Sequence, residues 1–257
     1  MIETKALTKY LDELLGTSRI PDYSGALNGL QLSNDGPINR IAAAVDFSSR
    51  SIAAATTQKA NLLLVHHGMF WGSIKPLTGV HFRRIKSLIQ NDVAVYSSHL
   101  PLDCHPVFGN NVLLSRTLGL ELDGGFAHFK GTAIGVTGRA NTPTVELVER
   151  ARSFARANGG DVVVSGLKPG AVTKSWAVCT GAGASAETLE EAISLGVDTL
   201  VVGEGPHWTA VEADEVGIAI IYAGHYATET LGVRALAKHV AEKFSLEWFP
   251  VSAPTGL

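Results

Sequence analysis

Disulfide chemistry is almost excluded by the composition, because the 257 residues include only two cysteines, Cys104 and Cys179. Two thiols provide no disulfide framework, which favours a reducing compartment. The start of the chain lacks the charged and apolar regions of a signal peptide. The longest apolar runs, such as residues 62–65, are far too short to span a bilayer. We therefore expect a cytoplasmic protein without a membrane segment.

An excess of charge of either sign is also missing. Lys and Arg number 21 against 24 Asp and Glu, which gives a formal net charge of −3. A general nucleic-acid-binding protein carries a basic excess, so nucleic acid is not an expected partner. The basic group Arg83, Arg84 and Lys86 predicts the solvated face of a helix. Gly-x-Ser-x-Gly, Walker A and Cys-x-x-Cys motifs are absent, which leaves metal-assisted chemistry as the favoured class.

Hydrophobic residues make up 46% of the chain and charged residues 18%, which supports a buried globular core. Apolar periodicity divides the chain into alternating strand-like and helix-like segments. The expected strands are 41–47, 61–65, 93–97, 133–136, 162–164, 175–179, 199–202, 218–222 and 246–251, and the expected helices are 2–15, 51–59, 81–89, 112–118, 144–157, 186–195, 209–215 and 232–244. Strands that alternate with helices indicate an α/β fold with mostly parallel sheets.

The chain also repeats part of its own sequence. Residues 96–103, Tyr-Ser-Ser-His-Leu-Pro-Leu-Asp, align with residues 222–229, Tyr-Ala-Gly-His-Tyr-Ala-Thr-Glu, and both segments follow a strand-like run. Further upstream, residues 64–68 align with residues 201–205. Any two apolar strands resemble each other, but the matched polar residues favour two related α/β halves.

Histidine and acidic residues follow four of the expected strands. His66 and His67 follow 61–65, His99 and Asp103 follow 93–97, Glu204 follows 199–202, and His225 and Glu229 follow 218–222. In parallel α/β sheets, ligands bind outside the carboxyl ends of the strands. The sequence therefore predicts one site at this edge.

The adjacent pair His66 and His67 indicates two metals rather than one. In an extended segment, neighbouring side chains point to opposite faces, so two neighbouring metals that each take one imidazole suit the geometry better. A carboxylate can bridge two metals, which makes Asp103 or Glu229 the candidate bridge. An isolated His-His pair is more often structural, but the two acids and His225 favour ligation by imidazole and carboxylate, which suits Zn, Fe or Mn.

Two further residues are candidates for catalysis or for orienting the ligands. His99 could bind substrate or orient Asp103, although a satisfied histidine at a strand end is an equal alternative. Glu204 occupies the repeat position of His67, so it could act as an acid, a base or a partner of a ligand. Asn110 and Asn111 are expected to cap the following helix. We place the first lobe, with the His-His and Asp ligands, at residues 1–125. The second lobe, at residues 126–257, returns its His and Glu to the shared cleft.

Several motifs occur in the order typical of one known family. They are Gly29-Leu-Gln-Leu, His66-His-Gly-Met-Phe-Trp, Ser98-His-Leu-Pro-Leu-Asp, Gly109-Asn-Asn, Gly203-Glu and Ala223-Gly-His-Tyr-Ala-Thr-Glu. The chain resembles the NGG-interacting-factor-like family of dinuclear metal-centre proteins, often named GTP cyclohydrolase 1 type 2 homologues. The resemblance implies two interlinked α/β lobes and a homohexamer with internal sites. It also implies the metal ligands His66, His67, Asp103, His225 and Glu229. Tyr226 departs from the pattern, because relatives often carry a second His there.

Two functions follow as hypotheses. The first is a dinuclear-metal-dependent hydrolase of the GTP cyclohydrolase type, which opens a ring of a nucleotide-like substrate by hydrolysis. The second is a non-catalytic, metal-binding hexameric scaffold or regulatory interaction protein. Turnover of a substrate by the metal-loaded protein separates the two hypotheses.

Overall fold

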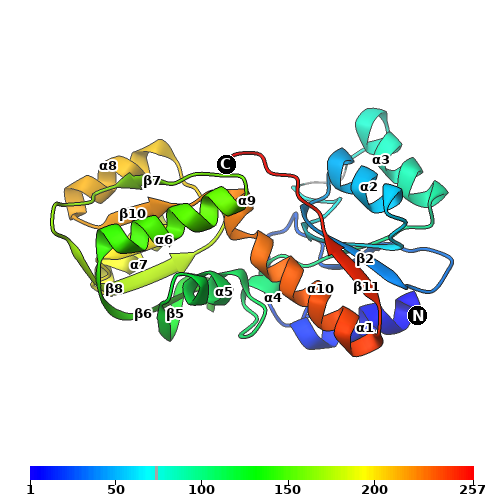
Figure 1. Ribbon diagram of the computed structural model, residues 1–257, viewed down its shortest axis with the longest axis horizontal. Helices are drawn as coiled ribbons and strands as arrows, with labels where there is room; N and C mark the ends of the chain where they lie inside the picture. Colours follow the sequence, from blue (N-terminus) through cyan, green and yellow to red (C-terminus); the bar gives the residue numbers. More distant parts are fainter. Residues whose placement is uncertain (73–74) are drawn as a thin grey trace. The chain divides into compact units, whose positions relative to one another are not determined.

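Short apolar strands alternate with amphipathic helices in the computed structural model, which describes residues 1–72 and 75–257. The chain forms two units: unit 1 is Met1–His105 with Gly232–Ala253, and unit 2 is Pro106–Leu231 with Pro254–Leu257. The prediction of an α/β fold is confirmed, with one mixed sheet in each unit. Figure 1 shows both sheets and the helices that cover them.

Unit 1 contains a five-stranded sheet in the order β1-β4-β3-β2-β11. Its strands are β1 (Gly29–Leu32), β2 (Arg40–Asp46), β3 (Leu62–His67), β4 (Ala94–Ser97) and β11 (Glu247–Pro250). Its helices are α1 (Thr4–Leu15), α2 (Ser49–Thr57), α3 (Gly79–Gln90), α4 (Leu100–Asp103) and most of α10 (Thr230–Phe244). Strands β11, β2, β3 and β4 run parallel, whereas β1 pairs with β4 in the antiparallel direction. The parallel strands therefore all end at one edge of the sheet.

The sheet of unit 1 is buried because helices cover both of its faces (Figure 1). On one face, Ile52 of α2 and Leu88 of α3 pack into a cluster with Leu63 of β3. On the other face, α1 carries the fully buried Leu7 and Leu11 and packs against α10 through an edge contact between Tyr10 and Phe244. Burial on both faces explains why the sequence of β3 begins with a continuous run of apolar residues rather than an alternation of apolar and polar residues.

Unit 2 contains a six-stranded sheet in the order β5-β6-β8-β9-β10-β7. Its strands are β5 (Glu121–Phe129), β6 (Thr132–Pro143), β7 (Val163–Ser165), β8 (Val172–Cys179), β9 (Thr199–Val202) and β10 (Ala219–Tyr222). Its helices are α5 (Asn110–Thr117), α6 (Thr144–Ala157), α7 (Ala186–Ser194), α8 (His207–Val216) and α9 (His225–Thr228). One cluster joins Leu114, Phe154 and the fully buried Trp176, and a second joins Leu189 and Ala213.

The two units share a core topology. In unit 1, β2, β3 and β4 are parallel neighbours, and the preceding strand β1 lies antiparallel beside β4. In unit 2, β8, β9 and β10 are parallel neighbours, and the preceding strand β7 lies antiparallel beside β10. In each unit the last parallel strand leads into a four-residue helix, α4 or α9. The structure thus pairs the same segments that the sequence repeat aligned.

The course of the chain differs from the sequence-based expectation in two respects. The units divide at residues 105 and 106 rather than at 125 and 126, and Gly232–Ala253 returns to unit 1. The reason is that β11 pairs with β2, which lies about two hundred residues earlier in the chain. The segment 133–136 is only part of a longer strand, since β5 and β6 form an antiparallel hairpin.

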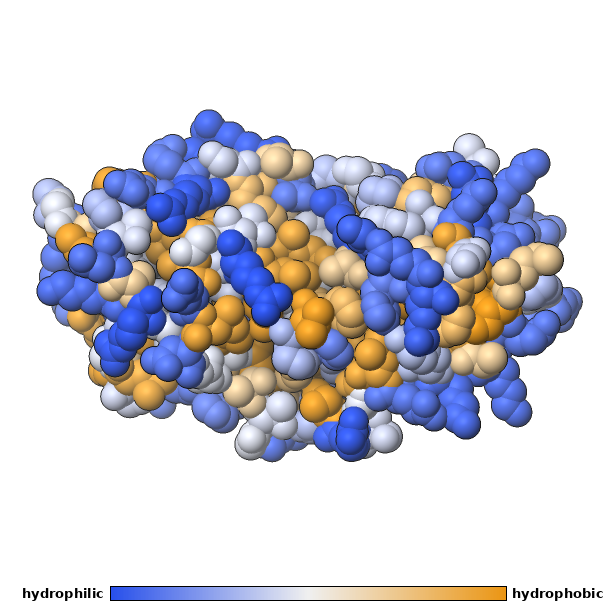
Figure 2. Space-filling model, turned by 60° about the horizontal axis from the view of Figure 1, so that its bottom comes forward, coloured by the Kyte–Doolittle hydropathy of each residue, from blue (hydrophilic) through white to orange (hydrophobic). Residues whose placement is uncertain are grey.

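The surface mixes polar and apolar side chains, as the face in Figure 2 shows. Among the exposed apolar side chains are Leu77, Phe82 and Ile89, with exposed fractions of 59%, 49% and 63%. In the described residues, none of the helices combines the length and the apolar character that crossing a bilayer requires.

Candidate metal centre

Three imidazole rings cluster in unit 1 beyond the carboxyl ends of β3 and β4. His66 and His67 end β3, and His99 directly precedes α4. The ring centroids of His66 lie 4.8 Å from those of both His67 and His99, and those of His67 and His99 are 5.6 Å apart. One ligand nitrogen from each ring falls within 4.8 Å of the others. Because the chain leaves the strand at Gly68, neighbouring histidines reach one cluster that could hold a metal ion.

Each of these rings is oriented by an oxygen that can only accept a hydrogen bond. His66 Nδ1 donates to the carbonyl oxygen of Ser98 over 2.9 Å. His67 Nδ1 donates to Asp46 Oδ1, and His99 Nδ1 donates to Asp22 Oδ1, both over 2.9 Å. In a neutral imidazole the proton on Nδ1 leaves the lone pair on Nε2, the arrangement that metal-ligating histidines typically adopt.

Asp103 brings a carboxylate to the same cluster. It is the last residue of α4, it is 7% exposed, and its Oδ2 lies 3.4 Å from Nε2 of the fully buried His66. When His66 Nδ1 holds the proton, a lone pair on Nε2 faces a carboxylate oxygen. A buried lone pair and a buried carboxylate repel each other, so they lie close together when a cation, either a proton or a metal ion, is held between them. The donor set therefore fits a divalent metal.

Trp71 and Gln31 shape the loop that follows the two histidines. The Trp71 ring lies 4.8 Å from His67 and 4.5 Å from His99, measured between centroids. Gln31 Oε1 accepts a hydrogen bond from the backbone N–H of Met69 over 2.6 Å. A Cβ on Gly68 would overlap the amide of Gln31, so a larger residue there would displace this side chain.

Unit 2 presents a second group of ligand type beyond β10. His225 begins α9 and Glu229 follows that helix, with Glu229 only 3% exposed. His225 Nε2 lies 3.1 Å from Glu229 Oε2, and its Nδ1 lies 2.8 Å from Glu204 Oε1. Glu204, predicted as an acid, a base or a partner of a ligand, thus contacts His225 directly. Burial lowers the pKa of His225, but Glu229 and Glu204 outweigh burial and raise this pKa to about 9.

The loop after β8 completes this part of unit 2. Gly181 has a φ of +64°, its N–H donates to Thr228 Oγ1, and its carbonyl accepts from the N–H of Glu204. The neighbouring Thr180 N–H donates to Asn111 Oδ1 over 2.8 Å. The prediction that Asn111 caps its helix is therefore wrong: Gly109 is the N-cap, and the Asn111 amide also donates to Ile134 across to β6.

Sequence reasoning missed the two carboxylates that orient the imidazoles of unit 1. Asp46 ends β2, and Asp22 lies in the loop before β1. Asp22 also accepts hydrogen bonds from the Asn28 amide and the Leu100 N–H. Burial raises the pKa of Asp22, but the contacts with His99 and Asn28 outweigh burial and lower it overall. The position of Asp46 at the end of a parallel strand was the available signal for this residue.

The thiol of Cys104 lies beside the carboxylates of Asp103 and Asp22. Burial, together with the charges of Asp103 and Asp22, raises the pKa of Cys104 to about 12. Cys104 therefore remains protonated near pH 7 in the metal-free chain.

We expect the Asp46→Asn substitution to weaken metal binding about 10–100-fold, because the His67 ring loses the carboxylate that orients it. The measurement is a competitive titration with a chromogenic chelator. The matched control is Asp123→Asn, which changes an exposed carboxylate on β5. Equal affinities for wild type and Asp46→Asn would show that the contact with Asp46 does not support a ligand.

These features define a class of protein: two α/β units of one core topology, each with imidazole and carboxylate groups beyond its parallel strands. The model of the family Duf34/NIF3 (NGG1p interacting factor 3) matches residues 2–254, and the chain belongs to this family. The resemblance inferred from the motifs is thereby confirmed.

Named relatives span nearly the whole chain. A protein of Deinococcus radiodurans is 39% identical over 251 residues, which cover 98% of this chain and 93% of that protein. A protein of Pyrococcus abyssi is 40% identical over 259 residues and covers both chains completely. Both are named "GTP cyclohydrolase 1 type 2 homolog". The crystal structure of a Thermus thermophilus protein, TTHA1606, is similar with a TM-score of 0.85, 34% identity and full coverage of both chains.

Proposed function

We propose that the chain binds two divalent metal ions and uses them to hydrolyse a nucleotide-like substrate. The proposed ligands are His66, His67 and Asp103 of unit 1 and His225 and Glu229 of unit 2. One observation carries the proposal: three imidazoles of unit 1 have their Nδ1 atoms held by acceptor oxygens, and His66 Nε2 faces a carboxylate. Zn, Fe and Mn are the candidate metals, since imidazole and carboxylate serve all three.

When bound, a pair of divalent cations acts as a Lewis acid and lowers the pKa of water toward neutrality. Residues of the chain orient the ligands and transfer protons. Asp46 and Ser98 orient the ligand rings, Trp71 covers the cluster on one side, and Asp22 orients His99. His99 and Glu204 are the groups proposed to move protons to and from the substrate.

The particular reaction proposed is that of a GTP cyclohydrolase, in which water opens the imidazole ring of guanine. Support for it comes from the names of the relatives, each a "GTP cyclohydrolase 1 type 2 homolog". The ring-opened product retains all atoms of GTP and gains one water molecule. Mass spectrometry therefore identifies it directly.

The test is a substrate screen with protein reconstituted separately with Zn, Fe and Mn. We expect a product one water heavier than GTP or another nucleotide. The Asp103→Asn protein should lose nearly all of this turnover, since the substitution removes a charged ligand. If metal is bound but no nucleotide is turned over, the protein fits the alternative function, a metal-binding scaffold or regulatory interaction protein.

A homohexamer in the cytoplasm is also part of the proposal. The assembly is proposed from the family resemblance, and the compartment from the low cysteine content, which suits a reducing environment. Light scattering coupled to size-exclusion chromatography measures the assembly. A mass of one or two chains at micromolar concentration would contradict the hexamer.

A further inference from the structure

A cavity of about 370 Å³ adjoins the imidazole cluster within unit 1. Its wall includes His67, Trp71, Phe47, Lys75 and Arg84. This volume lies within the range of pockets that hold small molecules. The wall thus includes His67, a proposed metal ligand, and its other residues named above contribute aromatic rings and positive charge. From these groups we propose that the cavity binds the phosphate of a small substrate through Arg84 and Lys75 and stacks its planar ring on Trp71.

Arg84 is positioned for this role rather than for the solvated helix face predicted from the sequence. It is half-buried, whereas its neighbour Arg83 is exposed. Its Nε donates to Ser49 Oγ over 3.1 Å, and its Cζ lies 5.9 Å from the centre of the Phe47 ring. The bond to Ser49 uses one of five N–H donors, and a planar guanidinium matches two oxygens of a phosphate.

The charge of the wall favours an anion. Asp46 is the acidic residue in the wall, and it already accepts a hydrogen bond from His67. The start of α3, a helix of twelve residues, also contributes Val80 to the wall. Within the described residues, the Thr78 side chain makes no capping hydrogen bond there, so the positive end of the helix adds to the charge of Arg84 and Lys75.

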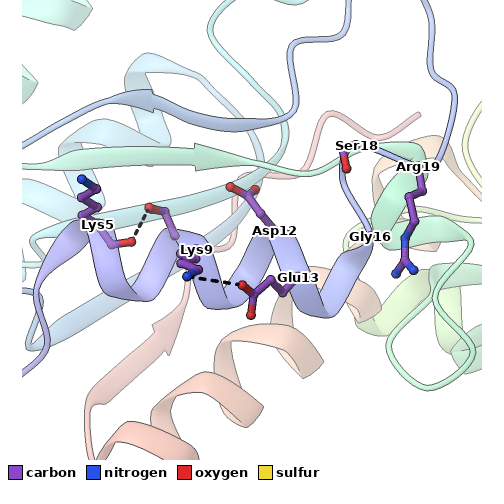
Figure 3. Close-up of a pocket in the computed structure, with 8 residues that line it drawn as sticks. Lys5, Lys9, Asp12, Glu13, Gly16, Ser18 and Arg19 are labelled. Atoms are coloured by element: carbon purple, nitrogen blue, oxygen red, sulfur yellow. Dashed lines mark hydrogen bonds and ion pairs between the residues drawn. The ribbon is translucent and has the colours of Figure 1, made fainter.

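A larger cavity in unit 1, about 680 Å³, differs in its lining, because none of the described residues that line it is aromatic (Figure 3). Its basic residues Lys5, Lys9 and Arg19 stand beside the acids Asp12 and Glu13. Lys9 pairs with Glu13 over 3.8 Å, as Figure 3 shows. This cavity therefore offers no ring on which a planar substrate could stack.

Trp71 supplies the surface for a planar ring. It is 38% exposed, and its ring contacts both His67 and His99. A ring stacked on Trp71 therefore lies next to the imidazole cluster while its phosphate reaches Arg84. This substrate class deepens the proposed hydrolase function and rests on it, but the anion site itself is measurable without metal or turnover.

The experiment is calorimetric titration of the metal-stripped full-length protein with inorganic pyrophosphate, GMP and guanosine. We expect pyrophosphate and GMP to bind, and Arg84→Gln to weaken both about tenfold or more, as loss of a charge-assisted hydrogen bond does. Arg83→Gln, on the same helix but outside the cavity, should leave both affinities unchanged. Lys75→Gln serves as a second variant if Arg84→Gln lowers the melting temperature.

A third variant separates a nucleotide site from a plain phosphate site. Trp71→Leu should weaken GMP several-fold and leave pyrophosphate unchanged. Three results would overturn the proposal. They are no binding by the wild type, equal losses of affinity in Arg83→Gln and Arg84→Gln, and an equal effect of Trp71→Leu on the affinities for GMP and pyrophosphate. Metal content is measured on the same variants. If the wild type binds pyrophosphate and GMP but takes up no metal on reconstitution, that result would count against the hydrolase, not against the anion site.

Discussion

Replacement of His66 by alanine is expected to abolish metal binding at the imidazole cluster of unit 1. Its Nε2 lies 3.4 Å from Asp103 Oδ2, and its Nδ1 donates to the Ser98 carbonyl oxygen. Loss of a direct ligand should exceed the roughly 10–100-fold effect of losing an outer partner. Inductively coupled plasma mass spectrometry after dialysis against micromolar metal measures the loss.

Two further variants make this prediction specific. Asp103→Asn keeps the volume of the side chain and removes the charge, so it should lose metal even if the cavity left by His66→Ala perturbs folding. His128→Ala removes an exposed imidazole that pairs with Glu191 over 2.8 Å, and its metal content should equal that of the wild type. Full metal content in both His66→Ala and Asp103→Asn would exclude these residues as ligands.

The Gly181→Ala substitution is expected to disrupt the ligand group of unit 2 without removing any ligand. A Cβ at Gly181 would overlap Glu229 Oε1 and lie 3.4 Å from His225 Nε2. The carboxylate must therefore leave its present position beside the imidazole. We expect loss of metal from this group and a free energy of unfolding lower by about 1–2 kcal/mol for the left-handed backbone and by a further ~1–3 kcal/mol for the displaced buried carboxylate.

Gly196→Ala is the matched control for backbone strain. Gly196 belongs to the same unit and has the same φ of +64°, but a Cβ there meets nothing within 4 Å. It should show the backbone cost alone, with metal content unchanged. Urea unfolding and metal analysis of both proteins give the comparison. Identical metal content in both variants would mean that Glu229 does not need its present position.

The candidate ligands could be predicted from the sequence because their signals are local. His66 and His67 end a run of apolar residues, and His225 and Glu229 follow another such run. Parallel strands bring such residues to one sheet edge wherever the strand is identified correctly. The shared order of strands in both units also follows from a repeat that can be read in the sequence.

The orienting partners could not be predicted, because their contacts join residues far apart in the chain. Asp46 lies 21 residues from His67, and Asp22 lies 77 residues from His99. Each is an ordinary aspartate until the fold brings it to a ring nitrogen. The sequence predicted a solvated Arg84 for the same reason, because its hydrogen-bond partner Ser49 belongs to another element.

The limits of the units and the β5–β6 hairpin escaped prediction for different reasons. Residues 121–125 of β5 are all exposed, and two of them are glycines, so that part of the strand shows no alternation of apolar and polar side chains. The return of α10 and β11 to unit 1 depends on pairing between β11 and β2. Such long-range pairing leaves no mark in local periodicity.

The number of metal ions per chain in the full-length protein, measured after reconstitution with Zn, Fe or Mn and exhaustive dialysis, decides whether the chain holds a dinuclear centre. Anomalous scattering from crystals of the same material identifies each ion and its ligands. We predict two ions per chain, with ligands from among His66, His67, Asp103, His225 and Glu229, and a lower count after substitution in either unit. Fewer than one ion per chain with every metal, or ions bound only to other residues, would contradict the account.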